Sequence, residues 1–459
     1  MDQRMLNRIS LLLMVCATNA LAADPGRDFV ASAGAAHSFL TRLCDDFGGR
    51  VTGSEQNAAA MERLAAELRA LGYQPRIDTF RMPGWERGDD RVAMIEPHAR
   101  SLRVAALCYS DAQAAFAADA VDLGDFKPEQ RATTLRGKVG IVSPSTPFAM
   151  REIAAAASEH GLRALLLINR EAGGQLLART GSFTGETLPL PIYSITQEEG
   201  RWLQRLLARG RPVRLRVETK SRVRGVETAN LVVRIPGKSP ETIVVGAHFD
   251  SWDLGQGALD NGLGVAQLYA LAHGLRDRSL ARTVELIWFN GEEQGLWGSR
   301  HAAAQLGEAP VSVMVNLDMV GVPIAVNALG DSDLVPVLER WHLARGKRLP
   351  LGVQNINWLA SDHTPYQLAG VRAVTFNAPI PRESVRYYHD LADTIDKLPA
   401  SIVVESTAII AEVVLALATD PDLPAGRRAA DDTARLFTSF GLEPRLRGMG
   451  LWHFDNSTP

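Results

Sequence analysis

The stretch ETIVVGAHFDSWDLGQGALDNGLGVAQLYALAHG, residues 241–274, contains an apolar strand, a glycine-rich loop and an apolar helix. The same rhythm surrounds it, with ANLVVRIPG before it and TVELIWFN, GLWGSRHAAAQL, VSVMVNLD and VRAVTFN after it. Such alternation predicts an α/β domain in which helices cover a mixed, mostly parallel central sheet. Ligands of these sheets bind beyond the carboxyl ends of the strands, so we expect the functional site there.

Residues of the kinds that bind zinc stand at or just after the ends of these apolar runs. They are His248, Asp260, Glu292, Glu293 and Asp318, and His389 follows later in RYYHDLADT. Neutral imidazoles and carboxylates are typical zinc ligands, and a further carboxylate can handle protons. The pattern predicts a hydrolase with two zinc ions per chain.

The charges of these residues assign them to two metal ions. Two zinc ions bring four positive charges, which Asp260, Glu293 and Asp318 balance together with one hydroxide. We expect Asp260 to bridge the ions, because nearby glycines allow its loop to fold back. One ion then takes His248 and Asp318, and the other takes Glu293 and His389.

Two acidic residues of this set are expected to act without binding metal. Glu292 is left over beside Glu293, and a carboxylate in that place can take a proton from water and pass it to the leaving amine. Asp250 is expected to accept the ring N–H of His248. Each residue alone has a simpler explanation, such as a helix N-cap for Asp260. Their joint occurrence at strand ends favours the site.

The composition bounds the class of protein. A chain of 459 residues with 46 % hydrophobic content is too long for one ordinary domain. The net charge of −3 and the absence of a basic stripe in the sequence argue against a nucleic-acid partner. Cys44 and Cys108 could form a disulfide or remain buried thiols, and the sequence leaves both open.

The first residues resemble a secretory signal. Basic residues precede a short apolar run, and Ala20-Leu21-Ala22 forms a cleavage site, which predicts a signal peptide over residues 1–22. We therefore expect a periplasmic or secreted protein. The apolar run is too short to span a bilayer and we find no other long apolar segment, so stable membrane insertion is not expected.

The remaining chain divides by texture into four parts. Residues 23–96 begin with two helical patterns and form the N-terminal part of the catalytic domain, which continues over residues 225–420. Between them, residues 97–224 show many short strands without metal-type clusters, which predicts an inserted α+β module. Residues 421–459 form a polar tail without a functional interpretation.

The inserted module resembles the protease-associated domain. Members of that family share a GKV-IV strand, a G-x-A-LL strand and a proline–isoleucine–glycine stretch. The matching residues, in order, are Gly137, Lys138, Val139, Gly161, Ala164, Pro191, Ile195 and Gly200. Because the module lacks a cluster of metal-type residues, we expect it to be a lid or packing module rather than a second active site.

The motifs H-x-D, D-N-G, G-E-E, N-x-D and Y-H resemble those of the co-catalytic di-zinc exopeptidases, the leucyl aminopeptidase and glutamate carboxypeptidase type. Within that family, HFDSWDLGQGALDNG is most similar to the carboxypeptidase Q group and its bacterial relatives. The resemblance implies a three-layer sandwich, the same five zinc ligands, and Glu292 as general acid/base. It also implies a cis peptide after Asp260 and suggests a homodimer acting on short peptides.

The sequence leaves several alternatives open. The expected exopeptidase could be an aminopeptidase, a dipeptidase or a carboxypeptidase, and its side-chain preference is undetermined. Arg386, Tyr387 and Tyr388 precede His389 and could help to bind substrate, although surface packing also explains them. A single-zinc aminoacyl cyclase or deacylase of the same fold is a second hypothesis. A non-catalytic, receptor-like module is a third.

Overall fold

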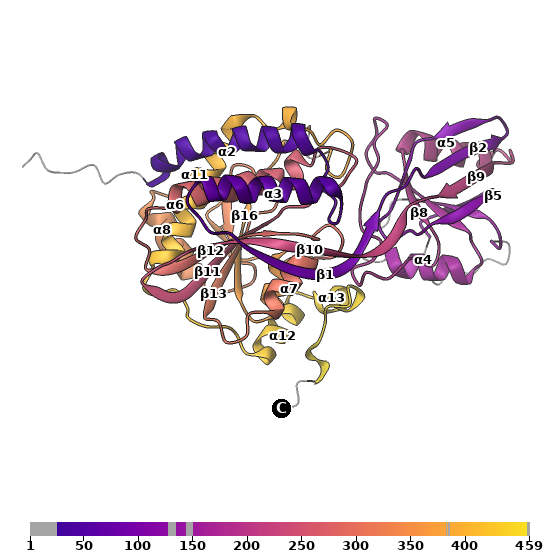
Figure 1. Ribbon diagram of the computed structural model, residues 1–459. Coiled ribbons are helices and arrows are strands. Elements are labelled where there is room, and N and C mark those ends of the chain that lie inside the picture. The colour runs from indigo at the N-terminus through magenta and orange to yellow at the C-terminus, as the bar shows by residue number, and fades with distance from the viewer. Residues whose placement is uncertain (1–24, 127–134, 144–149, 382, 384–385, 457–459) are drawn as a thin grey trace, which may run out of the picture.

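The chain forms two regions, each built on its own sheet (Figure 1). The computed structural model describes residues 25–126, 135–143, 150–381, 383 and 386–456, so the expected signal over 1–22 lies outside the described residues. Each sheet has eight strands within this part of the chain. The long strands β1 (Arg76–Glu86) and β10 (Arg222–Ile235) pair along the whole of β1 and extend from the larger region toward the smaller one (Figure 1).

The first sheet is mixed and is parallel at its centre. Its strand order is β1-β10-β12-β11-β13-β16-β14-β15. The further strands are β11 (Ser239–His248), β12 (Arg282–Phe289), β13 (Val311–Asn316), β14 (Ala325–Asn327), β15 (Val353–Gln354) and β16 (Arg372–Asn377). Strands β12, β11, β13 and β16 run parallel, whereas β10 and β14 run antiparallel to their central neighbours. The mixed α/β fold predicted from the sequence is confirmed.

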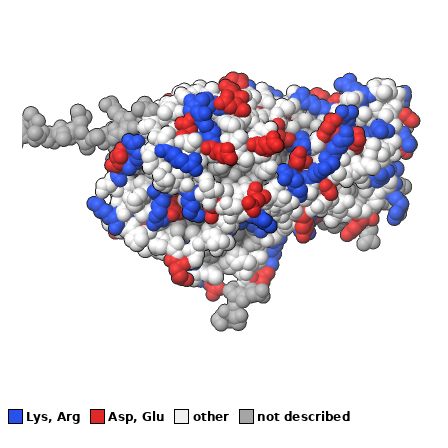
Figure 2. Space-filling view, viewed as in Figure 1, with Lys and Arg blue, Asp and Glu red and all other residues white. Residues whose placement is uncertain are grey.

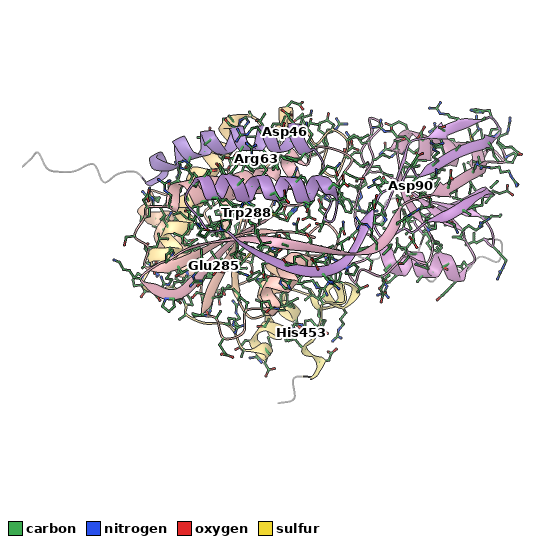
Figure 3. The ribbon with its side chains drawn as sticks, viewed as in Figure 1. Asp46, Arg63, Asp90, Glu285, Trp288 and His453 are labelled. Carbon is green, nitrogen blue, oxygen red and sulfur yellow. The ribbon has the colours of Figure 1, made fainter. Side chains whose placement is uncertain are left out.

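Helices pack on both faces of the first sheet. One face carries α2 (Pro25–Phe47), α3 (Glu55–Ala70), α6 (Leu263–Leu275), α8 (Val335–Ala344) and α11 (Ala400–Thr419), and the other carries α7 (Trp297–Ala304) and α9 (His363–Leu368). Helix α6 is buried on nearly all sides because it lies between the sheet and α2 and α11, which explains its apolar sequence. Trp288 of β12, labelled in Figure 3, is fully buried and donates its indole N–H to the carbonyl of Val265 in α6 at 3.3 Å.

Helix α11 corrects one expectation. The sequence analysis found no long apolar segment after the signal, yet α11 is the one helix of the described residues that is long and apolar enough to cross a membrane by length and composition. Within the fold, 67 % of its apolar window is buried, and it packs against α2 and α6. Burial in the protein core accounts for its composition, because a helix covered on most sides needs few polar residues.

The second sheet forms the smaller region. Its strand order is β3-β2-β9-β5-β6-β7-β8-β4. The elements are β2 (Arg91–Glu96), β3 (Arg100–Leu102), β4 (Val104–Ala106), β5 (Gln113–Gly124), β6 (Val139–Val142), α4 (Met150–Glu159), β7 (Ala164–Ile168), β8 (Ile192–Ile195), α5 (Gln197–Ala208) and β9 (Arg214–Thr219). We call residues 91–219 the second-sheet region. It has its own apolar cluster and begins a little before residue 97, because β2 pairs with β9.

The C-terminal tail folds back onto the larger region. Helices α12 (Ala430–Ser439) and α13 (Glu443–Gly448) are followed by the short helical turn η4 (Phe454–Asn456). Their apolar residues form one cluster with Leu296 and Leu359. The tail is therefore a packed part of the fold, which its polar sequence did not indicate.

The two cysteines of the described residues, Cys44 and Cys108, are free thiols. Cys44 lies in α2 and Cys108 follows β4, and both are buried. Burial raises the pKa of the Cys44 thiol to about 12, so it stays protonated at neutral pH. Of the two alternatives left open by the sequence, the structure contains the pair of buried thiols.

Charged side chains are distributed rather than segregated. On the face shown in Figure 2, basic and acidic residues alternate over both regions. Arg63 and Glu67 on α3 form one such pair, with 2.7 Å between Nη2 and Oε1. Pairs of this exposed kind contribute about 0.3–0.5 kcal/mol each, so they add little to the stability of the fold.

A matched pair of leucines tests the role of α6. Leu271 of α6 is fully buried, whereas 59 % of Leu343 in α8 is exposed. We expect Leu271→Ala to lower the free energy of unfolding by about 2–5 kcal/mol, because it leaves a cavity in the core. Leu343→Ala should change it by less than about 0.5 kcal/mol. Urea unfolding followed by circular dichroism measures both, and equal effects would contradict a core role for α6.

Candidate metal centre

Three adjacent strands of the first sheet deliver side chains to one edge. His248 is the last residue of β11, Asp318 follows β13, and the pair Glu292 and Glu293 follows β12. The three strands are parallel neighbours, so their carboxyl ends lie together. Asp260 comes from the loop between β11 and α6, within the π-helical turn η2 (Ala258–Gly262).

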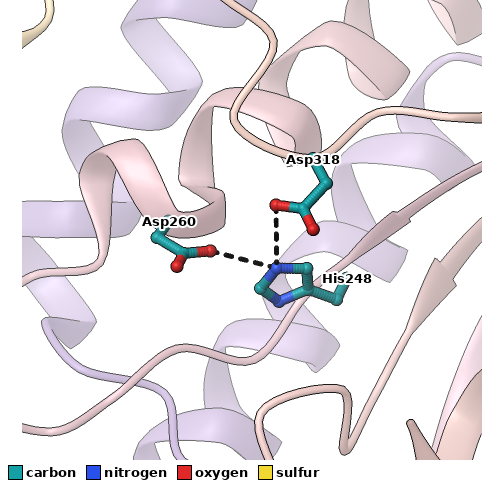
Figure 4. A group of neighbouring side chains, drawn as sticks. All are labelled: His248, Asp260 and Asp318. Atoms are coloured by element: carbon teal, nitrogen blue, oxygen red, sulfur yellow. Dashed lines mark ion pairs between the residues drawn. The ribbon is translucent and has the colours of Figure 1, made fainter. Parts of the chain in front are cut away.

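The first group of metal-type side chains consists of His248, Asp260 and Asp318 (Figure 4). Nε2 of His248 lies 3.1 Å from Oδ1 of Asp260 and 3.6 Å from Oδ1 of Asp318. The second group consists of Asp260, Glu293 and His389. Nε2 of His389 lies 2.9 Å from Oδ2 of Asp260 and 3.0 Å from Oε2 of Glu293.

Asp260 therefore belongs to both groups and presents one oxygen to each. In each group the possible ligand atoms lie within 4.8 Å of one another. These are the two groups that the sequence analysis predicted, with Asp260 in the bridging place. That they bind metal remains a prediction, which the protonation and hydrogen bonding of the groups support.

The electrostatics of both groups favour a cation. Burial acts to lower the pKa of His389, but the charge of Glu293 and a hydrogen bond to Asp260 raise it to about 10. Burial likewise opposes a charge on His248, yet the charge of Glu292 and contacts with Asp250 and Asp260 raise its pKa well above the usual value. The carboxylates thus stabilise positive charge at the imidazoles. They would stabilise a divalent cation bound in place of a proton in the same way.

An unsatisfied atom also fits a metal ion. Oε1 of Glu293 is buried and accepts no hydrogen bond from any described residue. A buried carboxylate oxygen without a donor is unfavourable, and a cation between the three side chains of the second group would remove that cost. The donor set of imidazole and carboxylate is also the one that zinc prefers. The residues present therefore fit two zinc ions.

Glu292 stands apart from both groups, as predicted. It is half-buried and faces a pocket of about 380 Å³. The pocket is lined by His248, Asp260, Glu292, Asp318, Met319, Trp358, Ala360, Tyr388 and His389. Burial raises the pKa of Glu292 well above its usual value, and the nearby charges of Asp318 and Glu293 raise it further against the opposing charge of His248. A carboxyl group with a raised pKa can both accept and return a proton.

Asp250 does not act as predicted. The ring of His248 donates from Nδ1 to the main-chain carbonyl of Asp250 at 3.0 Å, whereas Oδ1 of Asp250 is 3.7 Å away. The carboxylate instead accepts the amides of Glu292 at 3.2 Å and Glu293 at 3.3 Å. The reason is local: the chain turns directly after β11, so the side chain points to the loop after β12. Nδ1–H is still engaged, which leaves Nε2 of His248 free for a metal.

Of the three residues before His389, only Tyr388 lines the pocket. Its ring stacks on His389, with 3.6 Å between centroids. Arg386 instead donates to the carbonyl of Ala172 at 2.9 Å and lies over the ring of Tyr387. Tyr388 therefore lies where it can contact a substrate, whereas Arg386 packs against Ala172 and Tyr387.

Two supporting residues were missed from the sequence. Asp393 accepts the amides of Leu259 at 2.7 Å and Asp260 at 3.1 Å, which orients the shared carboxylate. Ser361 donates from Oγ to Oδ2 of Asp318 at 2.6 Å. Asp393 lies four residues after His389 and Ser361 lies in SDHTPYQLAGV, and the sequence analysis assigned neither residue a role.

The loop with Asp260 is also held by its neighbour and by a buried arginine. The peptide between Asp260 and Asn261 is cis, as the resemblance implies. Asn261 accepts the amide of Gly264 at 3.0 Å and donates to the carbonyl of Leu317 at 2.8 Å, so the loop is joined to the end of β13. Arg50, from the loop between α2 and α3, is fully buried. The sequence gave no hint of its role.

Among the described residues, the guanidinium of Arg50 bonds to main-chain carbonyls in the loop after β11 and in its own loop. Its guanidinium donates to Phe249 at 3.1 Å, Gln256 at 2.8 Å, Gly257 at 3.0 Å and Gly48 at 3.0 Å. Five fixed donors allow an arginine to bind several carbonyls at once. Arg50 therefore links the loop after α2 to the loop after β11 that leads to Asp260.

The chain is similar to known peptidases over the segment that contains the predicted metal-type residues. Residues 230–414 match peptidase family M28, and this segment contains every predicted metal-type residue. The chain is 24 % identical over 381 residues to aminopeptidase YwaD of Bacillus subtilis, covering 79 % of this chain and 80 % of that protein. It is 27 % identical over 273 residues to mouse carboxypeptidase Q, covering 56 % of this chain and 58 % of that protein.

Solved structures share the fold. A peptidase M28 precursor from Shewanella amazonensis has a TM-score of 0.77 at 22 % identity and covers 88 % of this chain and 97 % of its own. The zinc aminopeptidase BSAP from Bacillus subtilis has a TM-score of 0.69 at 21 % identity and covers 85 % of this chain and 96 % of its own. Both regions of the present chain therefore have counterparts in solved proteins.

A substitution at Arg50 tests its role in the loop. We expect Arg50→Ala to lower the free energy of unfolding by about 3 kcal/mol or more, because it leaves several buried carbonyls without donors. Arg81 is the control, since its side chain is 86 % exposed and pairs only with Glu227 at 3.3 Å. Arg81→Ala should cost about 0–1 kcal/mol. Thermal and urea unfolding of the two variants would contradict the assignment if both were near neutral.

Proposed function

We propose that the protein is a di-zinc exopeptidase of peptidase family M28, the family that residues 230–414 match. It hydrolyses peptide bonds near a free terminus of dipeptides or short peptides. One observation carries the proposal: Asp260 presents Oδ1 to His248 and Oδ2 to His389, so one carboxylate joins two metal-type groups. Aminopeptidase and carboxypeptidase relatives support the same reaction class.

The pocket supports a short substrate. Its volume of about 380 Å³ is at the small end of the usual range for ligand pockets, which suits one or two amino-acid residues. Met319, Trp358 and Tyr388 give it apolar and aromatic walls, while the acidic residues gather on the metal side.

The side chains divide the chemistry between them. Zinc, when bound, supplies Lewis acidity that polarises the scissile carbonyl and lowers the pKa of water. His248, Asp260, Asp318, Glu293 and His389 would hold the two ions. An oxygen of Glu292 takes a proton from the attacking water and then donates it to the nitrogen of the leaving amine. The carboxylate of Asp250 keeps Glu292 in place through its amide.

The alternatives use less of this site. A single-zinc cyclase or deacylase needs only one of the two groups, and a receptor-like module needs neither. Glu293 and His389 of the second group would then be buried without binding a metal ion. A two-metal peptidase uses both groups and the adjacent proton carrier.

We extend the proposal to the rest of the chain. Residues 97–224 form a protease-associated domain inserted between residues 23–96 and 225–420, a division that the separate apolar cluster of the second-sheet region supports. The chain is exported to the periplasm or secreted, with cleavage after residue 22. Its partners are short peptides, and it pairs with a second copy of itself. It binds no nucleic acid and does not insert stably into a membrane.

Glu292→Gln tests the proton carrier. Glu292 lies in neither metal group, so the variant should retain both zinc ions. Turnover of a dipeptide should fall by a factor of about 100–10,000, because the amide cannot move the proton. Glu308→Gln is the control, since Glu308 is exposed outside the site. Substantial activity in zinc-loaded Glu292→Gln would remove Glu292 from this role.

Metal removal and end-blocked peptides test the reaction class. A chelator should abolish hydrolysis of a free dipeptide, and zinc should restore it, because both metal groups are needed. One short peptide is then supplied free, N-acetylated and C-amidated. Loss of cleavage on N-acetylation identifies an aminopeptidase, loss on C-amidation a carboxypeptidase, and loss on both a dipeptidase. Hydrolysis that persists in the chelator would refute the proposal.

A further inference from the structure

The two metal groups differ in what supports them. His248 and Asp318 stand at the ends of the central strands β11 and β13. Main-chain bonds hold those ends: the amide of Phe249 donates to Phe289 at 2.6 Å, and that of Leu317 donates to Gly246 at 2.8 Å. His248 and Asp318 of the first group are therefore held by the first sheet itself.

Unlike His248, His389 does not lie at the end of a strand of the first sheet. It stands in a turn before the short helix η3 (Ile395–Lys397), and its φ is 56°. Residues other than glycine rarely adopt this left-handed conformation, so contacts from elsewhere have to maintain it. The second group thus depends on what holds this turn.

The second-sheet region supplies those contacts through two amides. The amide of Ala178 donates to the carbonyl of His389 at 3.0 Å. The amide of Leu176 donates to the carboxylate of Asp390, which is 3 % exposed. The segment with these amides is in turn anchored to β8, because the amide of Leu177 donates to Oγ of Ser194 at 2.9 Å.

The ring of His389 is flanked by two aromatic side chains. Tyr388 stacks on it at 3.6 Å between centroids, and Trp252 meets it edge-on at 5.9 Å. Trp252 is buried in the apolar cluster of the second-sheet region and contacts Trp85 of that cluster at 6.3 Å. The second-sheet region therefore contacts the main chain of His389 through an amide and its ring through Trp252.

We propose that Asp390 is a positioning residue, through which the second-sheet region holds His389 in place for the second metal ion. The proposal rests on the proposed di-zinc function and concerns only the group of Asp260, Glu293 and His389. Occupancy of that group then depends on the second-sheet region, whereas occupancy of the His248 group does not. The region acts as a structural part of the metal centre as well as a neighbour of the pocket.

Two substitutions at Asp390 separate hydrogen bonding from charge. Asp390→Asn keeps a carbonyl oxygen that can accept the amide of Leu176, and Asp390→Ala removes the acceptor. Zinc titration against a competing chelator counts the ions and measures each affinity. We expect two ions in the parent protein and in Asp390→Asn. In Asp390→Ala we expect the second ion to bind about tenfold or more weakly, with the first unchanged.

Controls keep a folding defect distinct from the proposed effect. Asp396→Ala removes an exposed acid nearby that bonds to Lys397, and it should leave both affinities unchanged. Leu176→Pro removes the amide donor from the other side of the contact, so it should reproduce the loss seen in Asp390→Ala. Circular dichroism and melting curves show which variants are folded, and Leu176→Pro decides the matter if Asp390→Ala does not fold.

The outcomes also separate this inference from the proposed function. Equal affinity for the second ion in the parent, Asp390→Ala and Leu176→Pro would overturn the role of Asp390 and leave a di-zinc enzyme intact. Fewer than two ions in the parent protein would refute the proposed function itself. Weakening of both ions together in Asp390→Ala would show a general structural role and would likewise overturn the inference.

Discussion

The structure depends on burying several carboxylates beside two histidines at one edge of the first sheet. Like charges at this separation repel strongly where water is excluded, so the arrangement needs positive charge in its midst. Asp260 stands at the centre, with one oxygen toward His248 and the other toward His389. A shared carboxylate lets two cations sit close together, which is the basis of the proposed chemistry.

Charged groups around this edge act mainly on the main chain. Asp393 accepts the amides that lead into Asp260, Asp250 accepts those of Glu292 and Glu293, and Arg50 donates to the carbonyls of the same loop. Hydrogen bonds from charged groups are the stronger ones, and here they fix loops that carry no regular secondary structure. Small misplacements of catalytic groups are costly, so these bonds serve the reaction as well as the fold.

The centre lies where the two regions of the chain meet. Main-chain hydrogen bonds of the first sheet hold the strand ends that carry His248 and Asp318. The second-sheet region reaches the remaining histidine through the amides of Leu176 and Ala178. The tail adds a third support, since its helices pack against Leu359 beside Trp358 of the pocket. The first sheet, the second-sheet region and the tail therefore all contribute contacts that support the site.

The sequence by itself determined the alternation of strands and helices, the strand ends and the chemical types of the residues there. It also predicted Asp260 as the shared carboxylate, because the glycines around it allow its loop to fold back. Only the tertiary structure decided the contacts between distant segments: the buried α11, the grip of Arg50, the bond of Asp393 to the loop, and the true partner of the Asp250 carboxylate. The physical reason is that periodicity and residue type are local properties, whereas a hydrogen bond between residues far apart in the chain depends on how the whole chain packs.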